Sequence, residues 1–392
     1  MEDPIGPLVE ADESFDHPQV DTFGVGEPPS VPDARLSPSW TEKVVATAAA
    51  RDGSLQLEFG MGRYPNRRVQ DAFAGVSLGV QQWTVRASRR LGEEPHRTAV
   101  GPVRYDVVEP LREVRFRLEP SGVQPVAFDW RFRAEVPAHL EERERRRAHT
   151  PSQPDEDLVR YHQVGVADGW VELDGERHDI GAHSWFSSRD HSWGVRQGIG
   201  VPARGDGDVP PDLSVLVLWS PMLLERPGGA RYGIHHYLRS YSMPGFERVH
   251  FQGAVEHADG SRTGFAGVEP DLRFDPVNRR LLGGTLGFTT SDGSARPIHI
   301  EAASDTGFHL GTGLYFGFDG HHHGEERGLL HVDGEHIADC SLPEVARRVH
   351  QLRDCVVTVD DPVGGGHGWG TVQSIVTGPH PAMGLDAGTS FV

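Results

Sequence analysis

The chain has 392 residues, a formal net charge of −19 and 37% hydrophobic residues, so it can bury the core of one large β domain or of two or three smaller domains. The surplus of acid argues against nucleic acid as a partner, because phosphate contacts need clustered positive charge. Lys43 is the single lysine, which excludes a phosphate-binding Walker lysine and leaves almost no option for Schiff-base chemistry.

Two features of the sequence bear on location. No stretch approaches the ~20 apolar residues needed to cross a bilayer, and the acidic start of the chain lacks the apolar run of a secretory signal. The two cysteines, Cys340 and Cys355, form neither a CxxC motif nor a disulfide framework, which favours a reducing compartment. We therefore expect a cytoplasmic protein that is not an integral membrane protein, and a homo-oligomer is compatible with this expectation.

Residues 1–38 combine nine acidic residues with seven prolines and a single arginine. Such a segment buries too little apolar surface to offset the entropy lost on ordering, so we expect a flexible or surface-wrapped arm. The globular part is expected to begin near Trp40.

After the arm, hydrophobic residues recur with period two. This alternation is typical of antiparallel strands with one face in the core. It occurs in four segments of the first half: 54–59, 103–108, 113–119 and 126–134. We expect residues 39–150 to form an N-terminal β domain.

Residues 135–157 interrupt the alternation with dense charge followed by two prolines at 151 and 154, which indicates a short exposed helix and then a linker. A second β domain is expected over 151–392, with an Asp-Gly turn at 174–175. Further strands are expected at 160–180, 213–219, 231–240, 249–255, 280–290, 296–302, 308–316, 355–359 and 368–376.

One segment, 341–354, has the pattern of a helix. Ser341 and Glu344 have the spacing of a capping box, Pro343 falls in the first turn, and Val345, Val349 and Leu352 form an apolar stripe. The sequence thus predicts an all-β protein with one short helix in its C-terminal region.

The densest group of chemically active residues is HSWFSSRDHSWGVR, residues 183–196. In an extended strand the odd-numbered residues share one face, which separates His191 from Asp190. A buried Asp has a raised pKa and can act as a general acid, and His can act as acid or base. Alternatively, Asp190 belongs to a structural polar cluster that joins two sheets.

The motif Asp-His-Ser-Trp-Gly, which begins at Asp190, resembles a recurring element of tandem lipocalin-like proteins. That group includes the carotenoid 1,2-hydratases (hydroxyneurosporene synthases) and, more distantly, lipocalin-like Diels–Alderases. The resemblance implies two lipocalin-like halves over roughly 40–392, with a barrel cavity for bulky apolar molecules. In the hydratases an Asp protonates an alkene, and the resemblance does not establish Asp190 as that residue.

Two other segments are candidates. Histidines concentrate after residue 160, at 235–236 and at 321–323, where His321, His323 and Glu325 are candidate metal ligands. Because no HExxH or facial-triad spacing occurs, a hairpin tip is the alternative interpretation of 321–323. The Gly-rich segment 363–370 lacks a following helix and predicts a loop at the border of a cavity.

We therefore expect a cofactor-independent hydratase, isomerase or cyclase that uses acid–base chemistry on a hydrophobic small molecule such as a terpenoid, steroid or polyketide. Asp190 and His191 are the expected catalytic residues, and no metal site is assigned. The expected substrate-binding residues are Trp185, Trp193, Arg196, His235, Tyr237, His367 and Trp369. The alternatives are a carrier of hydrophobic ligands and a metal enzyme built on His235, His236 and 321–323.

Overall fold

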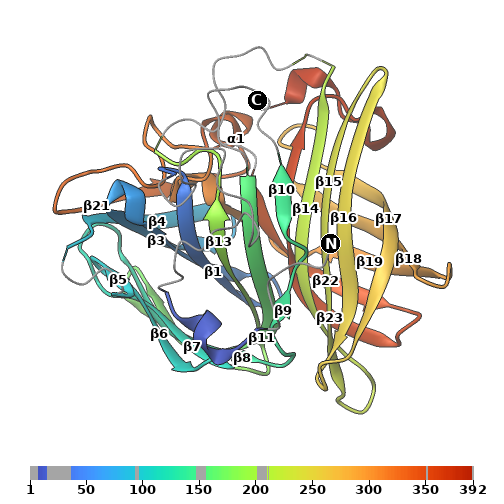
Figure 1. Ribbon diagram of the computed structural model, residues 1–392, viewed down its shortest axis with the longest axis horizontal. Coiled ribbons are helices and arrows are strands. Elements are labelled where there is room, and N and C mark those ends of the chain that lie inside the picture. Colours follow the sequence, from blue (N-terminus) through green and yellow to red (C-terminus); the bar gives the residue numbers. More distant parts are fainter. Residues whose placement is uncertain are drawn as a thin grey trace, which may run out of the picture.

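The computed structural model describes residues 8–15, 37–92, 97–146, 156–200, 210, 212–349 and 352–390 (Figure 1). It confirms an all-β protein with two lipocalin-like halves. The helical elements in the described parts are short: η1 (Glu10–Glu13), η3 (Pro65–Arg67), η4 (Leu310–Gly313), α1 (Pro343–Arg348), η5 (Pro381–Met383) and η6 (Ala387–Thr389). None of the helices in these ranges has the length and apolarity that crossing a membrane requires.

The first sheet is antiparallel and is drawn mainly in blue to green in Figure 1. Its strands lie in the order β21 (Leu330–Ile337), β4 (Gln81–Arg90), β3 (Val69–Leu78), β2 (Leu55–Tyr64), β1 (Trp40–Ala50), β13 (Trp185–Val195), β11 (Glu156–Leu173), β8 (Val126–Ala134), β7 (Glu113–Leu118), β6 (Val103–Glu109) and β5 (Ala99–Val100). Three short strands also pair with β11: β9 (His139–Leu140), β10 (Glu144–Arg146) and β12 (Glu176–Ile180).

The second sheet closes on itself. Its strands lie in the order β19 (Ala295–Ala302), β18 (Leu281–Thr290), β17 (Arg262–Phe274), β16 (Phe246–His257), β15 (Arg231–Met243), β14 (Ser214–Glu225), β23 (Gly366–Thr377), β22 (Arg353–Asp361) and β20 (Phe308–His309). Because β19 also pairs with β22, the sheet forms a closed barrel, and apolar side chains such as Leu218, Ile234 and Val255 fill its interior.

The change from one sheet to the other falls between β13 and β14, rather than at residues 150 and 151. The long strand β11 continues the first sheet by pairing with both β8 and β13, and β21 returns from the second half to pair with β4. The predicted folding units, 39–150 and 151–392, stay a prediction, and the sheets give a different dividing point.

Residues 8–15 differ from the flexible arm expected for 1–38. Glu13 is 2% exposed and Phe15 is 4% exposed, and Phe15 packs in the core of the first sheet. A buried ion pair with Arg189, described below, compensates for burying the Glu13 charge. Residues 1–7 and 16–36 lie outside the described residues.

The charge-rich segment after β8 contains no helix over its described part, 135–146, so that prediction is wrong there. The segment instead forms β9 and β10 along β11, and its charges are paired across the strands. Arg160 lies 2.7 Å from Glu141 and 3.2 Å from Glu144, which compensates for the burial of Glu141.

The predicted helix at 341–354 is shorter in the structure. α1 ends at Arg348, and Arg353 already begins strand β22. The expected capping box does not form, because the Ser341 hydroxyl donates instead to Asp339 at 2.6 Å.

The segment from Leu310 to Leu329 lies against the outer face of the first sheet. A strand was expected over 308–316, but after β20 the chain turns into η4, where a Cβ at Gly311 would lie 1.6 Å from the Val349 carbonyl oxygen. Gln82 of β4 donates to the Thr312 hydroxyl at 2.8 Å, which fixes this turn on the sheet. The following residues are thereby placed over β1, β2 and β3.

Candidate active site on the outer face of the first sheet

The strand pairing of β1 with β13 divides their side chains between two faces. Val44 is opposite His191, and Val45 is opposite Asp190. Val44 packs in the core of the first sheet, whereas Val45 lines a pocket on the other face. The prediction that Asp190 and His191 point to opposite faces is confirmed.

His191 lies inside the first sheet, where it is fully buried. Its Nδ1 lies 3.2 Å from the Tyr161 hydroxyl, and its Nε2 lies 3.0 Å from Glu42. Trp193 packs near the imidazole with ring centroids 5.6 Å apart, and Trp185 also belongs to this core. These three predicted site residues therefore lie on the inner face of the sheet, and of them His191 and Trp193 are in contact.

An ion pair from the N-terminal segment completes this interior cluster. Arg189 donates to both carboxylate oxygens of Glu13, at 2.7 and 2.6 Å, and to Gln163 at 2.9 Å. Tyr161 lies 3.2 Å from the same carboxylate. The cluster is fully enclosed, so it serves as a support for β13 from the inside.

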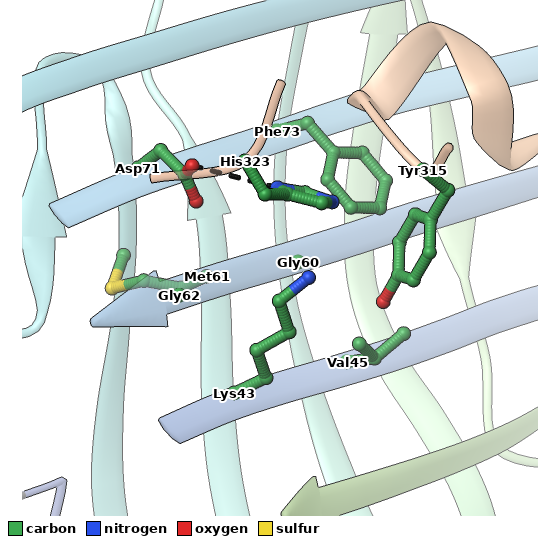
Figure 2. A pocket seen from close by; sticks show the side chains of 9 residues that line it. All are labelled: Lys43, Val45, Gly60, Met61, Gly62, Asp71, Phe73, Tyr315 and His323. Atoms are coloured by element: carbon green, nitrogen blue, oxygen red, sulfur yellow. Dashed lines mark ion pairs between the residues drawn. The ribbon is translucent and has the colours of Figure 1, made fainter. Parts of the chain in front are cut away.

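A small pocket lies on the opposite, outer face. It is lined from β1, β2 and β3 and is covered by the segment that follows η4 (Figure 2). Its cavity volume is about 10 Å³, enough for about one water molecule and far below the ~300–1,000 Å³ typical of small-molecule sites, so the pocket admits at most one small group of a larger molecule. The lining residues are Lys43, Val45, Gly60, Met61, Gly62, Asp71, Phe73, Tyr315 and His323.

Two glycines of β2 make room for this pocket. A Cβ at Gly60 would lie 2.1 Å from the Phe73 ring, and a Cβ at Gly62 would lie 2.3 Å from the Tyr64 hydroxyl. Because these positions carry no side chains, Phe73 can lie close to Gly60 and Tyr64 close to Gly62. Lys43 extends over Gly60 toward His323 and Tyr315 (Figure 2).

Lys43 is the central group of the pocket. It is 4% exposed, and its amine lies 4.6 Å from the centroid of the Tyr315 ring. No residue that the structure describes accepts a hydrogen bond from this amine or forms an ion pair with it. Burial lowers the pKa of Lys43 to about 7, and the Arg196 guanidinium acts in the same direction. A large fraction of the amine is therefore neutral near neutral pH.

Asp71 is held by three groups beside the lysine. The Tyr64 hydroxyl donates to it at 2.9 Å, the Gly324 backbone amide donates at 2.7 Å, and His323 Nδ1 lies 3.4 Å away. Burial acts to raise the pKa of Asp71, but His323 and Lys43 outweigh burial and hold this pKa below its usual value. Burial lowers the pKa of His323 to about 4, so its imidazole is neutral at pH 7.

Asp190 and Arg196 border the same region from β13. Arg196 donates to the Ser192 hydroxyl at 2.6 Å, and Ser192 in turn lies 3.4 Å from Asp190. Burial raises the pKa of Asp190, while Arg160 and Arg196 oppose this shift. Burial and the charge of Asp190 also raise the pKa of Tyr315.

The pocket residues were largely missed from sequence. Lys43 was noted only as the single lysine, Asp71 and Tyr315 were not singled out, and His323 was considered only with its neighbours as a metal ligand. The Gly-x-Gly spacing at 60–62 within an otherwise apolar strand was a usable signal, because glycine in a strand often marks a close approach of other groups.

His235 lies elsewhere, where the two sheets meet. Glu141, His162 and His235 place their ligand atoms within 4.8 Å of one another and are a candidate metal group. However, the rings of His162 and His235 are stacked, with centroids 3.5 Å apart and 21° between their planes. Their nitrogen lone pairs therefore run side by side instead of converging on one point. His162 is also occupied by Glu141 and Glu256, each at 3.1 Å.

The remaining predicted residues do not reach the pocket. Tyr237 is bonded by Arg239 near the His235 group. The His367 side chain is 77% exposed and pairs with Asp360, and Trp369 packs under Arg51 at 4.0 Å. In the segment 321–323, His321 pairs with Glu325 at 3.0 Å, whereas His323 turns inward. Both cysteines are free and buried.

Comparison with solved structures shows the same general fold in the first of three similar proteins. A protein assigned as AttH from Nitrosomonas europaea superimposes with a TM-score of 0.51 at 12% identity, covering 85% of this chain and 92% of its own. Kievitone hydratase from Nectria haematococca gives 0.41 at 11% identity, covering 86% and 89%. CghA with Sch210972 gives 0.46 at 13% identity, covering 88% and 90%.

Comparison of sequences gives a family but no characterised relative. No curated protein matches the chain. A family model, described as a family of unknown function (DUF8625), matches residues 31–386. Since this match spans nearly the whole chain, the protein belongs to that family.

Proposed function

We propose that this protein is an enzyme of the hydratase, isomerase or cyclase type, which moves protons on one end of a hydrophobic small molecule in the pocket around Lys43. The observation that carries the proposal is the buried, unpartnered Lys43 amine, which faces a pocket edged by Asp71, His323 and Tyr315. Leaving a buried amine without a partner costs stability, and such strain is typical of functional sites.

The groups around the pocket supply both an acid and a base. A carboxyl with a raised pKa, Asp190, delivers a proton to a carbon–carbon double bond, as expected for a general acid. Water then adds to the resulting cation, and the neutral Lys43 amine takes the proton that the water releases. The Lys43 amine lies over the face of the Tyr315 ring. The same π face stabilises a carbocation formed beside it.

In this proposal His191 acts through the structure rather than on the substrate. It lies behind β13, bonded to Tyr161 and Glu42, and it fixes the strand that carries Asp190. The predicted relation to carotenoid 1,2-hydratases stays a prediction from the Asp190–Gly194 motif.

The test is a panel of apolar alkenes, dienes and enones of terpenoid, steroid and polyketide type, incubated with the protein in D₂O. We expect mass spectrometry to find a hydrated, deuterated or cyclised product with the parent protein and none above background with Lys43→Met. His367→Ala, which alters an exposed side chain far from the pocket, is the matched control and should behave like the parent. Ligand that binds without conversion across the panel would favour the carrier instead.

A further inference from the structure

The sole lysine differs from the other buried cations of the first sheet. Arg189 donates to both oxygens of Glu13, and Arg63 lies 2.6 Å from Glu42. Among the described residues no carboxylate lies within ion-pair distance of the Lys43 amine, although Lys43 is similarly enclosed and Asp71 and Asp190 act on its charge from further away. Lys43 is therefore a buried primary amine without an ion-pair partner in the described part of the chain, at the wall of a pocket.

We propose that the Lys43 amine forms an imine with the carbonyl group of its substrate, which makes hydrophobic α,β-unsaturated aldehydes and ketones the substrate class. This inference rests on the proposed function, because it uses the same pocket, and it replaces the role of the amine as a simple base. It reverses the expectation from composition that a chain with one lysine leaves almost no room for Schiff-base chemistry.

The surroundings of the amine favour the nucleophilic form and then the cationic product. Burial and the neighbouring Arg196 charge disfavour the ammonium, and a lysine is activated as a nucleophile by an apolar pocket or an adjacent cation. After the imine forms, Asp71 and Asp190 are the nearby carboxylates whose charge favours its protonated form. The Tyr315 ring face adds to this stabilisation.

The covalent step is balanced without an oxidant or a reductant. The Lys43 nitrogen attacks the carbonyl carbon, the C–N bond forms, and the carbonyl oxygen gains a proton as the nitrogen loses one. The hydroxyl of this neutral carbinolamine then takes a second proton from the Asp190 carboxyl, the C–O bond breaks, water leaves, and the nitrogen carries the positive charge of the iminium beside the Asp190 carboxylate. Hydrolysis by one water molecule reverses the sequence and releases the product.

An iminium links the two kinds of reaction in the proposed function. It withdraws electrons from the conjugated double bond, which speeds the addition of water at the far carbon. The same electron demand speeds ring closure with a diene elsewhere in the molecule. One chemical step thus prepares a substrate for either hydration or cyclisation.

The test is reductive trapping on the full chain at pH 7. The protein is incubated with butanal, with benzaldehyde or with cinnamaldehyde, cyanoborohydride is added, and the adducts are mapped by peptide mass spectrometry. With a pKa of about 7, about half of the Lys43 amines are neutral, against roughly one in a few thousand for an ordinary lysine. We therefore expect Lys43 to be alkylated at least ~10-fold faster in the native protein than in the urea-unfolded protein.

Two internal references make the result unambiguous. The N-terminal amine is the only other primary amine of this sequence, and its alkylation rate in each sample is the reference against which Lys43 is compared. Lys43→Arg keeps the positive charge but cannot form an imine, so it should lose the internal adduct and the conversion of enones together.

The inference fails if native Lys43 is alkylated no faster than unfolded Lys43. If Lys43→Met then still abolishes proton transfer to the D₂O panel, the amine acts as a base and the proposed function stands without the imine. If Lys43 is alkylated rapidly but Lys43→Met leaves the conversion of the panel unchanged, the imine site stands and the proposed function fails.

Discussion

The two halves of the molecule use similar strands for different purposes. The barrel formed by β14–β19, β22 and β23 closes on itself and has an interior of apolar side chains such as Ile234 and Phe288. The first sheet buries charged groups on both faces: Arg189 and Glu42 on the inner face, and Lys43 on the outer face. Burying apolar side chains in a barrel stabilises the fold, whereas burying charged groups lowers the free energy of unfolding unless each charge is paired.

The comparison indicates that the two halves of the molecule have different roles. The second barrel supplies a rigid support and the segment from Leu310 to Leu329, which covers the outer face of the first sheet. In the proposed function, the first sheet supplies the reactive groups and the pairing that holds them. Substitutions in the two halves should therefore differ in kind as well as in size.

The largest expected effect on stability is in the interior of the first sheet. Arg189→Met leaves the Glu13 carboxylate buried without its cation, and we expect a loss of about 3–5 kcal/mol in the free energy of unfolding, measured in urea. Adding Glu13→Gln to Arg189→Met should restore part of this loss. A change below about 1 kcal/mol in the single variant would show that the Glu13–Arg189 ion pair contributes little to stability.

A cavity in the barrel of the second sheet should lower the free energy of unfolding without changing turnover. Ile234→Ala removes a fully buried side chain from the barrel interior, and we expect a loss of about 2–5 kcal/mol. Turnover per folded molecule should match that of the parent. A specific loss of turnover at full folding would show that the barrel interior, rather than the pocket at Lys43, is the site.

Within the first sheet, substitutions at two neighbouring residues of β13 should affect turnover and stability separately. Asp190→Asn should fold and lose at least ~10²-fold in turnover, because it removes an acid from the pocket face. His191→Gln should instead cost about 1–3 kcal/mol, because its partners Tyr161 and Glu42 lose a buried bond. Equal behaviour of the two variants in both turnover and urea unfolding would contradict this division.

The fold was largely predictable from local patterns, because strand alternation depends on neighbours in sequence. The same alternation correctly separated Asp190 from His191. The charge-rich segment 135–146 was misread because its charges are paired with residues of β11, a contact that composition does not reveal. The burial of Glu13 was missed for the same reason, since Arg189 lies 176 residues away.

The pocket was not predictable in this way. Lys43, Asp71 and Tyr315 come from three distant parts of the chain, and only the packing of the η4 segment on the sheet brings them together. Composition argued against a role for the lysine, because a chain with a single lysine has almost no option for Schiff-base chemistry. Because that one lysine is buried beside a pocket, it becomes a candidate reactive group instead.

The contact between the two halves holds a further pair of buried acids. Glu58 of β2 and Asp354 of β22 are fully buried and share the Thr47 hydroxyl, which lies 2.9 Å from Glu58 and 3.2 Å from Asp354. Gln56 donates to Glu58 at 2.8 Å. Two carboxylates this close cannot both be ionised cheaply, so the pair retains a proton.

The smallest expected effect is a pH dependence that originates in this pair. Burial raises the pKa of Asp354 to about 6, and burial together with Asp354 raises the pKa of Glu58 well above its usual value. The folded state therefore binds more protons than the unfolded state from about pH 4 upward, until the pH exceeds the raised pKa values of both acids. The contribution of the pair to stability is complete below about pH 4 and is lost as the pH rises through those raised pKa values.

Glu58→Gln should remove this dependence, because an amide bonds to the Asp354 carboxylate without needing the shared proton. We expect the parent to lose roughly 1–2 kcal/mol more than Glu58→Gln between pH 5 and pH 8, measured by urea unfolding at each pH. The difference between the two proteins isolates the pair, since Lys43 and His323 titrate in both. If both proteins show the same pH slope, the proton is not shared between Glu58 and Asp354. The two halves would then be joined by their apolar contacts and their uncharged hydrogen bonds, and acid would loosen the molecule through the ion pairs of the first sheet instead.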